Sequence, residues 1–188
     1  MSHKRPASAD VLVTYASRAG STAEIADVIH QTLAHNGLIV DLRPMQAVHD
    51  LSRYHAVVAG SAIQREKWLP EAMNFLQEHQ AALRQKPFAA FLVCMALSRP
   101  TARAQQSAQG WMQPVRALAQ PVSEGYFAGA LELRKVPLAY WPLFRVAILL
   151  GLWAEGDYRD WDAIRQWAGD LPGRFWQPPM TGQRLIRP

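Results

Sequence analysis

Apolar segments of strand length alternate along the chain with segments whose apolar residues recur at helical spacing. Five of the short segments are almost continuously apolar, which is typical of strands buried on both faces of a sheet. They span Asp10–Tyr15, Leu38–Arg43, His55–Gly60, Phe88–Met95 and Val122–Leu131. Strands separated by helices predict an α/β fold in which a parallel sheet is covered on both faces.

The helices are predicted from apolar residues three and four positions apart. In the first helix, Ile25, Ile29 and Leu33 share one face. The predicted helices span Ser21–Asn36, Pro70–Gln85, Thr101–Ala119 and Asp160–Asp170. Gly110 and Pro114 lie inside the third helix, and we expect them to weaken or bend it.

The alternation is interrupted once, between Leu133 and Tyr158. This stretch is too long for a simple strand-to-helix loop and is rich in aromatic and aliphatic residues, so we interpret it as an inserted, partly helical element. The total of 188 residues suits one domain. We therefore expect a flexible N-terminus over residues 1–9, a single domain over 10–171 with the insertion at about 133–158, and a Pro-rich, basic tail over 172–188.

Charge and cysteine content indicate which ligands the protein could bind and in which cellular compartment it could work. The net charge of +5 favours anionic partners, but the basic residues are dispersed and match no nucleic-acid-binding motif. Cys94 is the only cysteine, which excludes an intrachain disulfide and fits a reducing, cytoplasmic compartment. The six histidines lack metal-ligand spacing, so no metal site is expected. The longest apolar run, residues 146–154, is shorter than the roughly 20 residues that cross a bilayer.

The loop after the first strand carries the clearest candidate chemistry. It consists of Ser17, Arg18, Ala19, Gly20, Ser21 and Thr22. Its hydroxyls, its glycine and its arginine could hold a phosphate at the start of the next helix, where backbone N–H groups lack partners. The alternative is an ordinary polar turn that caps the helix. Neither G-x-G-x-x-G nor G-x-x-x-x-G-K-[ST] is present, so a terminal monophosphate fits better than a dinucleotide or a nucleoside triphosphate.

The segments after the third and fourth strands are expected at the same edge of the sheet, where α/β proteins bind ligands. Small residues after Gly60 would let a planar ligand approach the backbone. The candidate walls of this crevice are Ser61, Ala62, Ile63, Trp68, Met95, Ala96, Leu97 and Ser98. Trp68 could stack on the ligand or pack against the next helix. Lys67, Arg99 and Arg103 could hold an anionic substrate or lie solvated at the surface.

Several motifs resemble one family, the flavodoxin-like, quinone-dependent protoporphyrinogen oxidases. They are residues 15–22 (Tyr-Ala-Ser-Arg-Ala-Gly-Ser-Thr), 60–63 (Gly-Ser-Ala-Ile) and 127–131 (Phe-Ala-Gly-Ala-Leu). The aromatic insertion, with its Tyr140-Trp141 pair and Phe144, and the Asp160-Trp161 start of the last helix are similar to the same family. The order of segments resembles a flavodoxin over roughly residues 10–170.

The resemblance implies a flavodoxin-like, doubly wound sheet of five parallel strands in the order 2-1-3-4-5, with bound FMN. The FMN phosphate would lie on residues 17–22 and its ring between residues 61–68 and 95–99. The implied reaction is oxidation of protoporphyrinogen IX, an anionic porphyrin precursor, to protoporphyrin IX in haem biosynthesis, with electrons passed to a quinone. The insertion could contact the inner face of the cell membrane, cover the sheet edge as a lid, or join copies in a homo-oligomer.

Two alternative functions stay open, and no general base can be named from the sequence. A flavodoxin-like electron carrier would bind FMN without an organic substrate of its own. Such carriers resemble one another in being acidic, in contrast to the charge of +5 here. A domain that has lost FMN and serves as a binding module is opposed by the intact first loop.

Overall fold

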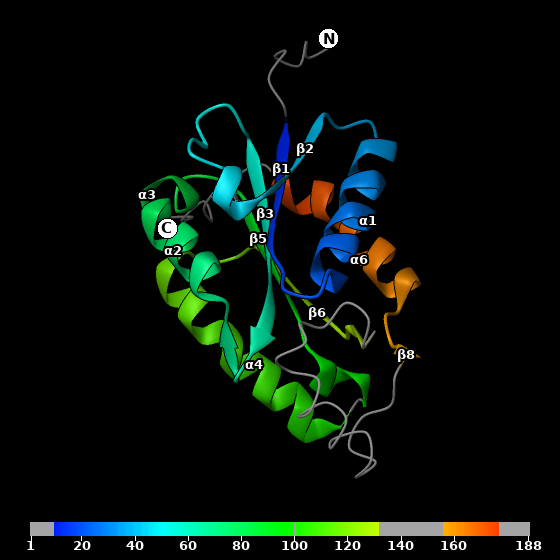
Figure 1. Ribbon diagram of the computed structural model, residues 1–188. Coiled ribbons are helices and arrows are strands. Elements are labelled where there is room, and N and C mark those ends of the chain that lie inside the picture. Colours follow the sequence, from blue (N-terminus) through cyan, green and yellow to red (C-terminus); the bar gives the residue numbers. More distant parts are fainter. Residues whose placement is uncertain (1–9, 100, 132–155, 177–188) are drawn as a thin grey trace, which may run out of the picture.

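The computed structural model describes residues 10–99, 101–131 and 156–176. They form a central sheet with helices on both faces (Figure 1). The five parallel strands are β1 (Val11–Ala16), β2 (Val40–Pro44), β3 (Ala56–Gln64), β5 (Phe88–Val93) and β6 (Ser123–Phe127). They lie in the order β2-β1-β3-β5-β6. The predicted α/β class and strand order are therefore confirmed.

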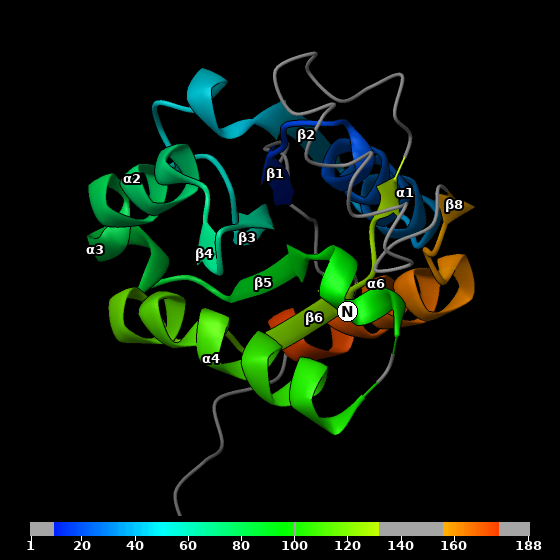
Figure 2. The same cartoon turned by 60° about the horizontal axis from the view of Figure 1, so that its bottom comes forward.

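The helices form one layer on each face of the sheet. The layers consist of α1 (Ser21–His35) with α6 (Trp161–Phe175), and of α2 (Pro70–Glu78) with α3 (Gln80–Leu83) and α4 (Ala102–Leu118) (Figures 1 and 2). Successive residues of a strand point to opposite faces. Val11 and Val13 of β1 therefore pack in the core beside α1 and α6, whereas Leu12 and Ala16 pack in the core beside α2 and α4.

β3 is longer than the sequence predicts, because the chain continues beyond the apolar run and folds back as a hairpin. The returning strand is β4 (Lys67–Trp68), which pairs antiparallel with the end of β3. The turn residues Arg65 and Glu66 have φ angles of 51° and 64°, as the common two-residue hairpin turn requires. Sequence reasoning predicted a loop here because neither turn residue is the glycine or asparagine that usually marks such a turn.

Two predicted helices have different limits in the structure. The segment predicted as one helix over Pro70–Gln85 is divided into α2 and α3 at His79, whose backbone leaves the helical region at φ −101° and ψ 11°. α6 continues through Pro172 to Phe175, beyond its predicted end. Burial of Leu171 and Phe175 on the apolar face of α6 offsets the backbone hydrogen bond that Pro172 cannot donate. Residues 172–176 therefore belong to the folded domain rather than to a tail.

The last predicted strand is also divided. After β6 the chain forms β7 (Ala130–Leu131), which pairs antiparallel with β8 (Gly156–Asp157) as a separate two-stranded ribbon. The insertion leaves and returns through this ribbon, and its residues 132–155 lie outside the described residues, as do residues 1–9 and 177–188. Among the helices of the described residues, none is long and apolar enough to cross a membrane.

Candidate functional site

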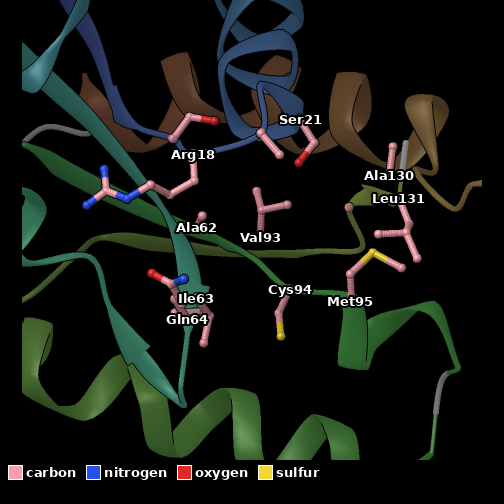
Figure 3. Close-up of a pocket in the computed structure, with 13 residues that line it drawn as sticks. Arg18, Ser21, Ala62, Ile63, Gln64, Val93, Cys94, Met95, Ala130 and Leu131 are labelled. Carbon is pink, nitrogen blue, oxygen red and sulfur yellow. The ribbon is translucent and has the colours of Figure 1, made fainter. Parts of the chain in front are cut away.

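A cleft opens at the carboxyl edge of the sheet, where β1, β3 and β5 end (Figure 3). Its walls come from the loop after β1, the end of β3, the end of β5 with the start of η2 (Met95–Ser98), and the segment that contains β7. These segments meet because parallel strands end at one edge of the sheet. The cleft is therefore a consequence of the strand order.

The loop between β1 and α1 is a tight turn held by its own hydrogen bond. Ser17 Oγ accepts a bond from the N–H of Gly20 at 3.1 Å, and Gly20 has a φ of 94°, which glycine adopts without strain. The Gly20 carbonyl accepts the N–H of Glu24 at 3.0 Å and so starts the helix. No hydrogen bond within the described part of the chain uses the backbone N–H of Ser21 or Thr22. Unpaired donors at the positive end of a helix dipole favour an anion.

Two further observations favour a phosphate at this loop. The Thr22 hydroxyl is fully buried and has no hydrogen-bond partner among the described residues, an arrangement that costs about 1–3 kcal/mol in the absence of a ligand or water. Gly129 faces the loop closely, because a Cβ at this position would lie 3.4 Å from Ser21 Oγ and 3.3 Å from Val93 Cγ1. A side chain at residue 129 would fill the space beside the loop.

The rest of the cleft is apolar. Figure 3 shows Ala62 and Ile63 from β3, Cys94 and Met95 after β5, and Leu131 of β7 around the opening. The volume of the cleft is about 170 Å³, below the roughly 300 Å³ of sites that enclose a ligand. The described walls would therefore hold a flat ring while leaving part of it exposed.

Cys94 places a sulfur atom in the cleft wall. Its Sγ accepts a hydrogen bond from the N–H of Ala96 at 3.4 Å. Burial raises the pKa of the Cys94 thiol, and the bond from Ala96 offsets only part of this effect. The thiol is therefore protonated at neutral pH and is a weak nucleophile.

Arg18 belongs to the loop, but its guanidinium binds a carboxylate of α2. Its guanidinium binds both carboxylate oxygens of Glu71 in α2, with Nη2 at 2.9 Å from Oε2. In Figure 3 the guanidinium extends away from Ser21. Burial would raise the pKa of Glu71, but hydrogen bonds from Arg18 and from the backbone N–H of Glu71 outweigh burial and hold this pKa below its ordinary value. The predicted cationic contact of Arg18 with a phosphate is not formed in this arrangement.

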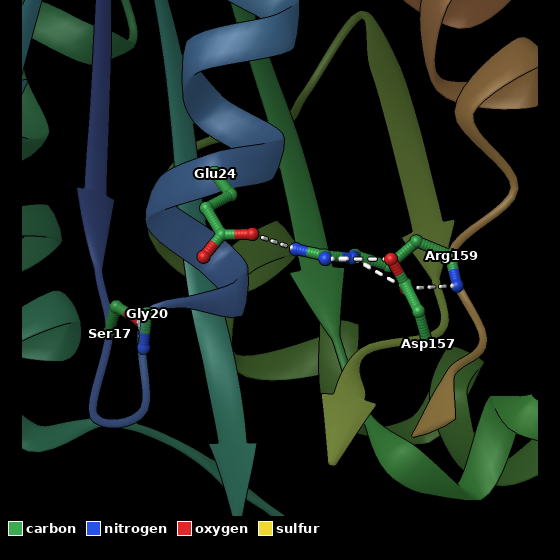
Figure 4. A network of polar contacts seen from close by, with 5 residues as sticks. All are labelled: Ser17, Gly20, Glu24, Asp157 and Arg159. Carbon is green, nitrogen blue, oxygen red and sulfur yellow. Dashed lines mark hydrogen bonds and ion pairs between the residues drawn. The ribbon is translucent and has the colours of Figure 1, made fainter. Parts of the chain in front are cut away.

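A second arginine, which sequence reasoning missed, approaches the loop from the other face of the sheet (Figure 4). The Arg159 side chain is 5% exposed and donates from Nε and Nη2 to Asp157 at 2.7 and 2.8 Å. Its Nη1 donates to Glu24 Oε2 at 2.5 Å, and its guanidinium lies 4.3 Å from the ring centre of Trp161. The bond to Asp157 is the main cause of the raised pKa of Arg159, which therefore stays charged.

Comparison of the sequence with known protein families identifies the cofactor of this chain. Residues 12–141 match the flavodoxin domain family. The chain belongs to this family. Its cofactor is FMN, and the donor-rich loop beside an apolar cleft fits the phosphate and the flat ring of FMN. The flavodoxin domain here is thus an FMN-binding redox protein. Comparison with curated proteins gives no match.

Solved structures similar to this flavodoxin domain support the same fold. A flavodoxin from the domain Archaea has 15% sequence identity and a TM-score of 0.57, covering 89% of this chain and 99% of its own. The Streptococcus pneumonia TIGR4 flavodoxin has 17% identity and a TM-score of 0.55, covering 87% and 98%. Oxidised flavodoxin 2 from Bacillus cereus has 24% identity and a TM-score of 0.50, covering 76% and 99%.

The structure brings some of the predicted site residues together around the cleft. The predicted residues that line the cleft are Ser17, Arg18, Ala19, Ser21, Ala62, Ile63 and Met95. The lining residues that sequence reasoning missed are Gln64, Val93, Cys94, Gly129, Ala130 and Leu131. A signal for the last three was available, because they lie in the motif at 127–131 that resembles the oxidase family, although no site role was assigned to it.

Other predicted residues have structural roles. Trp68 is 4% exposed, packs in the core beside α2 and α4, and is not among the residues that line the cleft. The buried Ser61 hydroxyl donates to the Ala62 carbonyl at 2.8 Å and accepts the N–H of Leu69 at 3.1 Å, which fastens the β3–β4 hairpin. Leu97 of η2 packs against the same core, and Ala96 and Ser98 do not line the cleft.

Gly60 and the three candidate substrate cations lie outside the cleft lining. A Cβ on Gly60 would lie 1.9 Å from Cζ of Phe91, so the absence of a side chain makes room for this core ring rather than for a ligand. Lys67, Arg99 and Arg103 are exposed and lie outside the cleft lining. Their role in holding an anionic substrate stays a prediction.

Proposed function

We propose that this flavodoxin domain is an FMN-dependent oxidoreductase that oxidises protoporphyrinogen IX to protoporphyrin IX and passes the electrons to a quinone. The observation that carries the proposal is the attachment of the insertion to the cleft. The chain enters the insertion from β7, whose Ala130 and Leu131 line the cleft, and returns through the paired strand β8. β7 therefore connects the ring site, where an organic substrate would have to meet the flavin, to the segment interpreted as the insertion.

The chain's own residues would hold the cofactor by its two ends. The phosphate would lie on the backbone donors of residues 17–22, with the Thr22 hydroxyl nearby, and the ring against Ala62, Ile63 and Met95. When bound, FMN supplies the hydride-accepting redox chemistry, while the protein supplies orientation and electrostatics. The weakly nucleophilic Cys94 thiol adds an uncharged wall to the ring site.

The basic surface supports an anionic substrate. The chain carries a net charge of +5, and Lys67, Arg99 and Arg103 are exposed at segments that follow β3 and β5. We assign these cations to the propionate carboxylates of the porphyrinogen. We assign the contact with the quinone, and peripheral contact with the membrane that holds it, to the insertion.

An anaerobic assay tests this function. Purified protein is first denatured, and release of FMN is measured by its fluorescence. FMN-loaded protein is then mixed with protoporphyrinogen IX and a soluble quinone, and porphyrin fluorescence is followed beside the same protein stripped of FMN. We expect a rate that requires both FMN and quinone. Porphyrin formation no faster than the background without protein would contradict the proposal, provided that FMN is bound.

A flavodoxin-like electron carrier is the second candidate function. It is favoured by the full-length fit to solved flavodoxins, of which this chain covers 99% and 98% in two cases. In the same assay a carrier would bind FMN, and its reduced form would pass electrons to cytochrome c, but it would not form porphyrin. The two candidates therefore differ in one measurable product.

A further inference from the structure

Glu24 places a negative charge beside the loop that receives the phosphate. Its backbone N–H bonds to the Gly20 carbonyl, and a Cβ on Gly20 would lie 3.8 Å from its Oε1. A carboxylate in the first turn is favourable for a helix with no ligand, because of the helix dipole. The same carboxylate repels a phosphate held at this helix start. The loop therefore contains a charge that opposes its expected ligand.

Arg159 is placed where it reduces this repulsion. Figure 4 shows its guanidinium between Glu24 and Asp157, with the Ser17–Gly20 loop on the far side of Glu24. Two parallel hydrogen bonds to Asp157 and the ring of Trp161 hold the guanidinium in place while Nη1 binds Glu24. Because the Arg159 side chain is 5% exposed, water screens this interaction less than it would at the surface.

The three side chains together carry one net negative charge, and they would carry two without Arg159. The added charge would act on the phosphate end of the cofactor rather than on its ring. Riboflavin has the same ring as FMN and no phosphate, so the two flavins separate the two effects.

We propose that Arg159 neutralises Glu24 beside the phosphate-binding loop and so sets the preference of this site for the phosphorylated flavin, FMN, over riboflavin. Arg159 is then a positioning and charge-balancing residue that acts on the cofactor through Glu24. The inference rests on the proposed placement of the FMN phosphate at residues 17–22.

The test measures the affinity of FMN-free protein for FMN and for riboflavin by quenching of flavin fluorescence. Arg159→Met keeps the apolar stem over Trp161 and removes the charge, and we expect it to weaken FMN binding about tenfold, equivalent to about 1.4 kcal/mol, with riboflavin changed less than about twofold. Glu24→Gln combined with Arg159→Met removes both charges, and we expect FMN affinity to return to within about twofold of wild type. The loss in Arg159→Met should also shrink at high salt.

Arg165→Met is the matched control, because Arg165 lies in α6, the helix that begins just after Arg159, binds Asp162 at 2.9 Å and is 55% exposed. We expect no change in either affinity for this variant. Equal losses of FMN and riboflavin affinity in Arg159→Met, or no recovery in the double variant, would overturn the inference and leave the FMN site in place. Failure of wild-type protein to bind FMN would instead overturn the proposed function and the inference with it.

Discussion

Two arginines at the loop between β1 and α1 bind carboxylates on opposite faces of the sheet: Arg18, in the loop, binds Glu71, and Arg159 binds Glu24. Arg18 binds Glu71 of α2 at the surface, where 49% of the arginine side chain is exposed. Arg159 binds Glu24 of α1 and is almost fully buried. Arg18 is part of the loop, whereas Arg159 lies 135 residues from Glu24, its partner at the loop. The arginine that sequence reasoning assigned to the phosphate is thus occupied elsewhere, and the distant one controls the charge at the loop.

The difference shows that burial, more than proximity, decides what an ion pair can do. An exposed pair is screened by water and salt, and contributes little to stability or to the field at a neighbouring site. A buried arginine with several carboxylate bonds is held in one position, and its loss leaves its partners without those bonds. The following changes test this comparison, from the largest expected effect to the smallest.

Gly20→Asp should break the loop that both arginines flank. It adds a carboxylate at the proposed phosphate site and forces a non-glycine residue to a φ of 94°. We expect FMN affinity to fall at least about a hundredfold, measured by fluorescence titration. Gly37→Asp is the control, because Gly37 has a φ of 81° and no atom would contact its Cβ within 4 Å. Stoichiometric FMN in Gly20→Asp would show that the site lies elsewhere.

Arg159→Met and Arg18→Met compare how much each ion pair contributes to the free energy of unfolding. We expect Arg159→Met to lower the free energy of unfolding by about 2 kcal/mol, since the bonds from Arg159 to Asp157 and Glu24 are lost. Arg18→Met should change it by less than about 0.5 kcal/mol. Urea denaturation of FMN-free protein, followed by circular dichroism, measures both. Equal effects would contradict the distinction between the pairs.

Alkylation of Cys94 should report on the cleft that the loop borders. Cys94 is the only cysteine, so iodoacetamide labels a single site. Its raised pKa predicts slow labelling at neutral pH and faster labelling as the pH rises. FMN at about ten times its dissociation constant should slow the reaction about tenfold, because only unbound protein reacts. Labelling in urea gives the unprotected rate, and a rate that FMN does not change would exclude Cys94 from the ring site.

Glu71→Gln should show the small contribution of the exposed pair through its pH dependence. The pKa of Glu71 is lowered in the folded protein, so its contribution to stability is complete above the ordinary glutamate pKa and is lost as the pH falls through the lowered value. The variant should lack this part of the acid-induced loss, which we expect to be less than about 1 kcal/mol. Glu78→Gln, at the exposed end of α2, is the control. An unchanged pH profile in Glu71→Gln would remove Arg18 from the stability of this region.

The fold was predictable because its signals are local. Continuous apolar runs predict the buried strands. The spacing of Ile25, Ile29 and Leu33 predicts α1, and all three side chains are buried in the structure. The limits of elements were less predictable where tertiary burial overrides local preference. Burial of Phe175 extends α6 through a proline, and the hairpin at Arg65 and Glu66 forms without a glycine.

The site was predictable only in part, for the same reason. The loop at residues 17–22 is visible in the sequence because its chemistry is contiguous. Trp68 suits a ligand or a core equally well by its residue type, and only packing against α2 and α4 decided for the core. A side chain at Gly60 would clash with the ring of Phe91. Phe91 lies on the neighbouring strand, and no local sequence pattern pairs it with Gly60.

The sequence by itself determined the alternation of strands and helices and, through family resemblance, the strand order and FMN as the cofactor, and it predicted that the loop at residues 17–22 holds the phosphate. Only the tertiary structure decided that Gly129 and Leu131 form the far wall of the cleft, that Arg18 turns to Glu71, and that Arg159 reaches Glu24. Local periodicity depends on short windows of sequence. Contacts between distant residues depend on how the layers pack, which those windows do not contain.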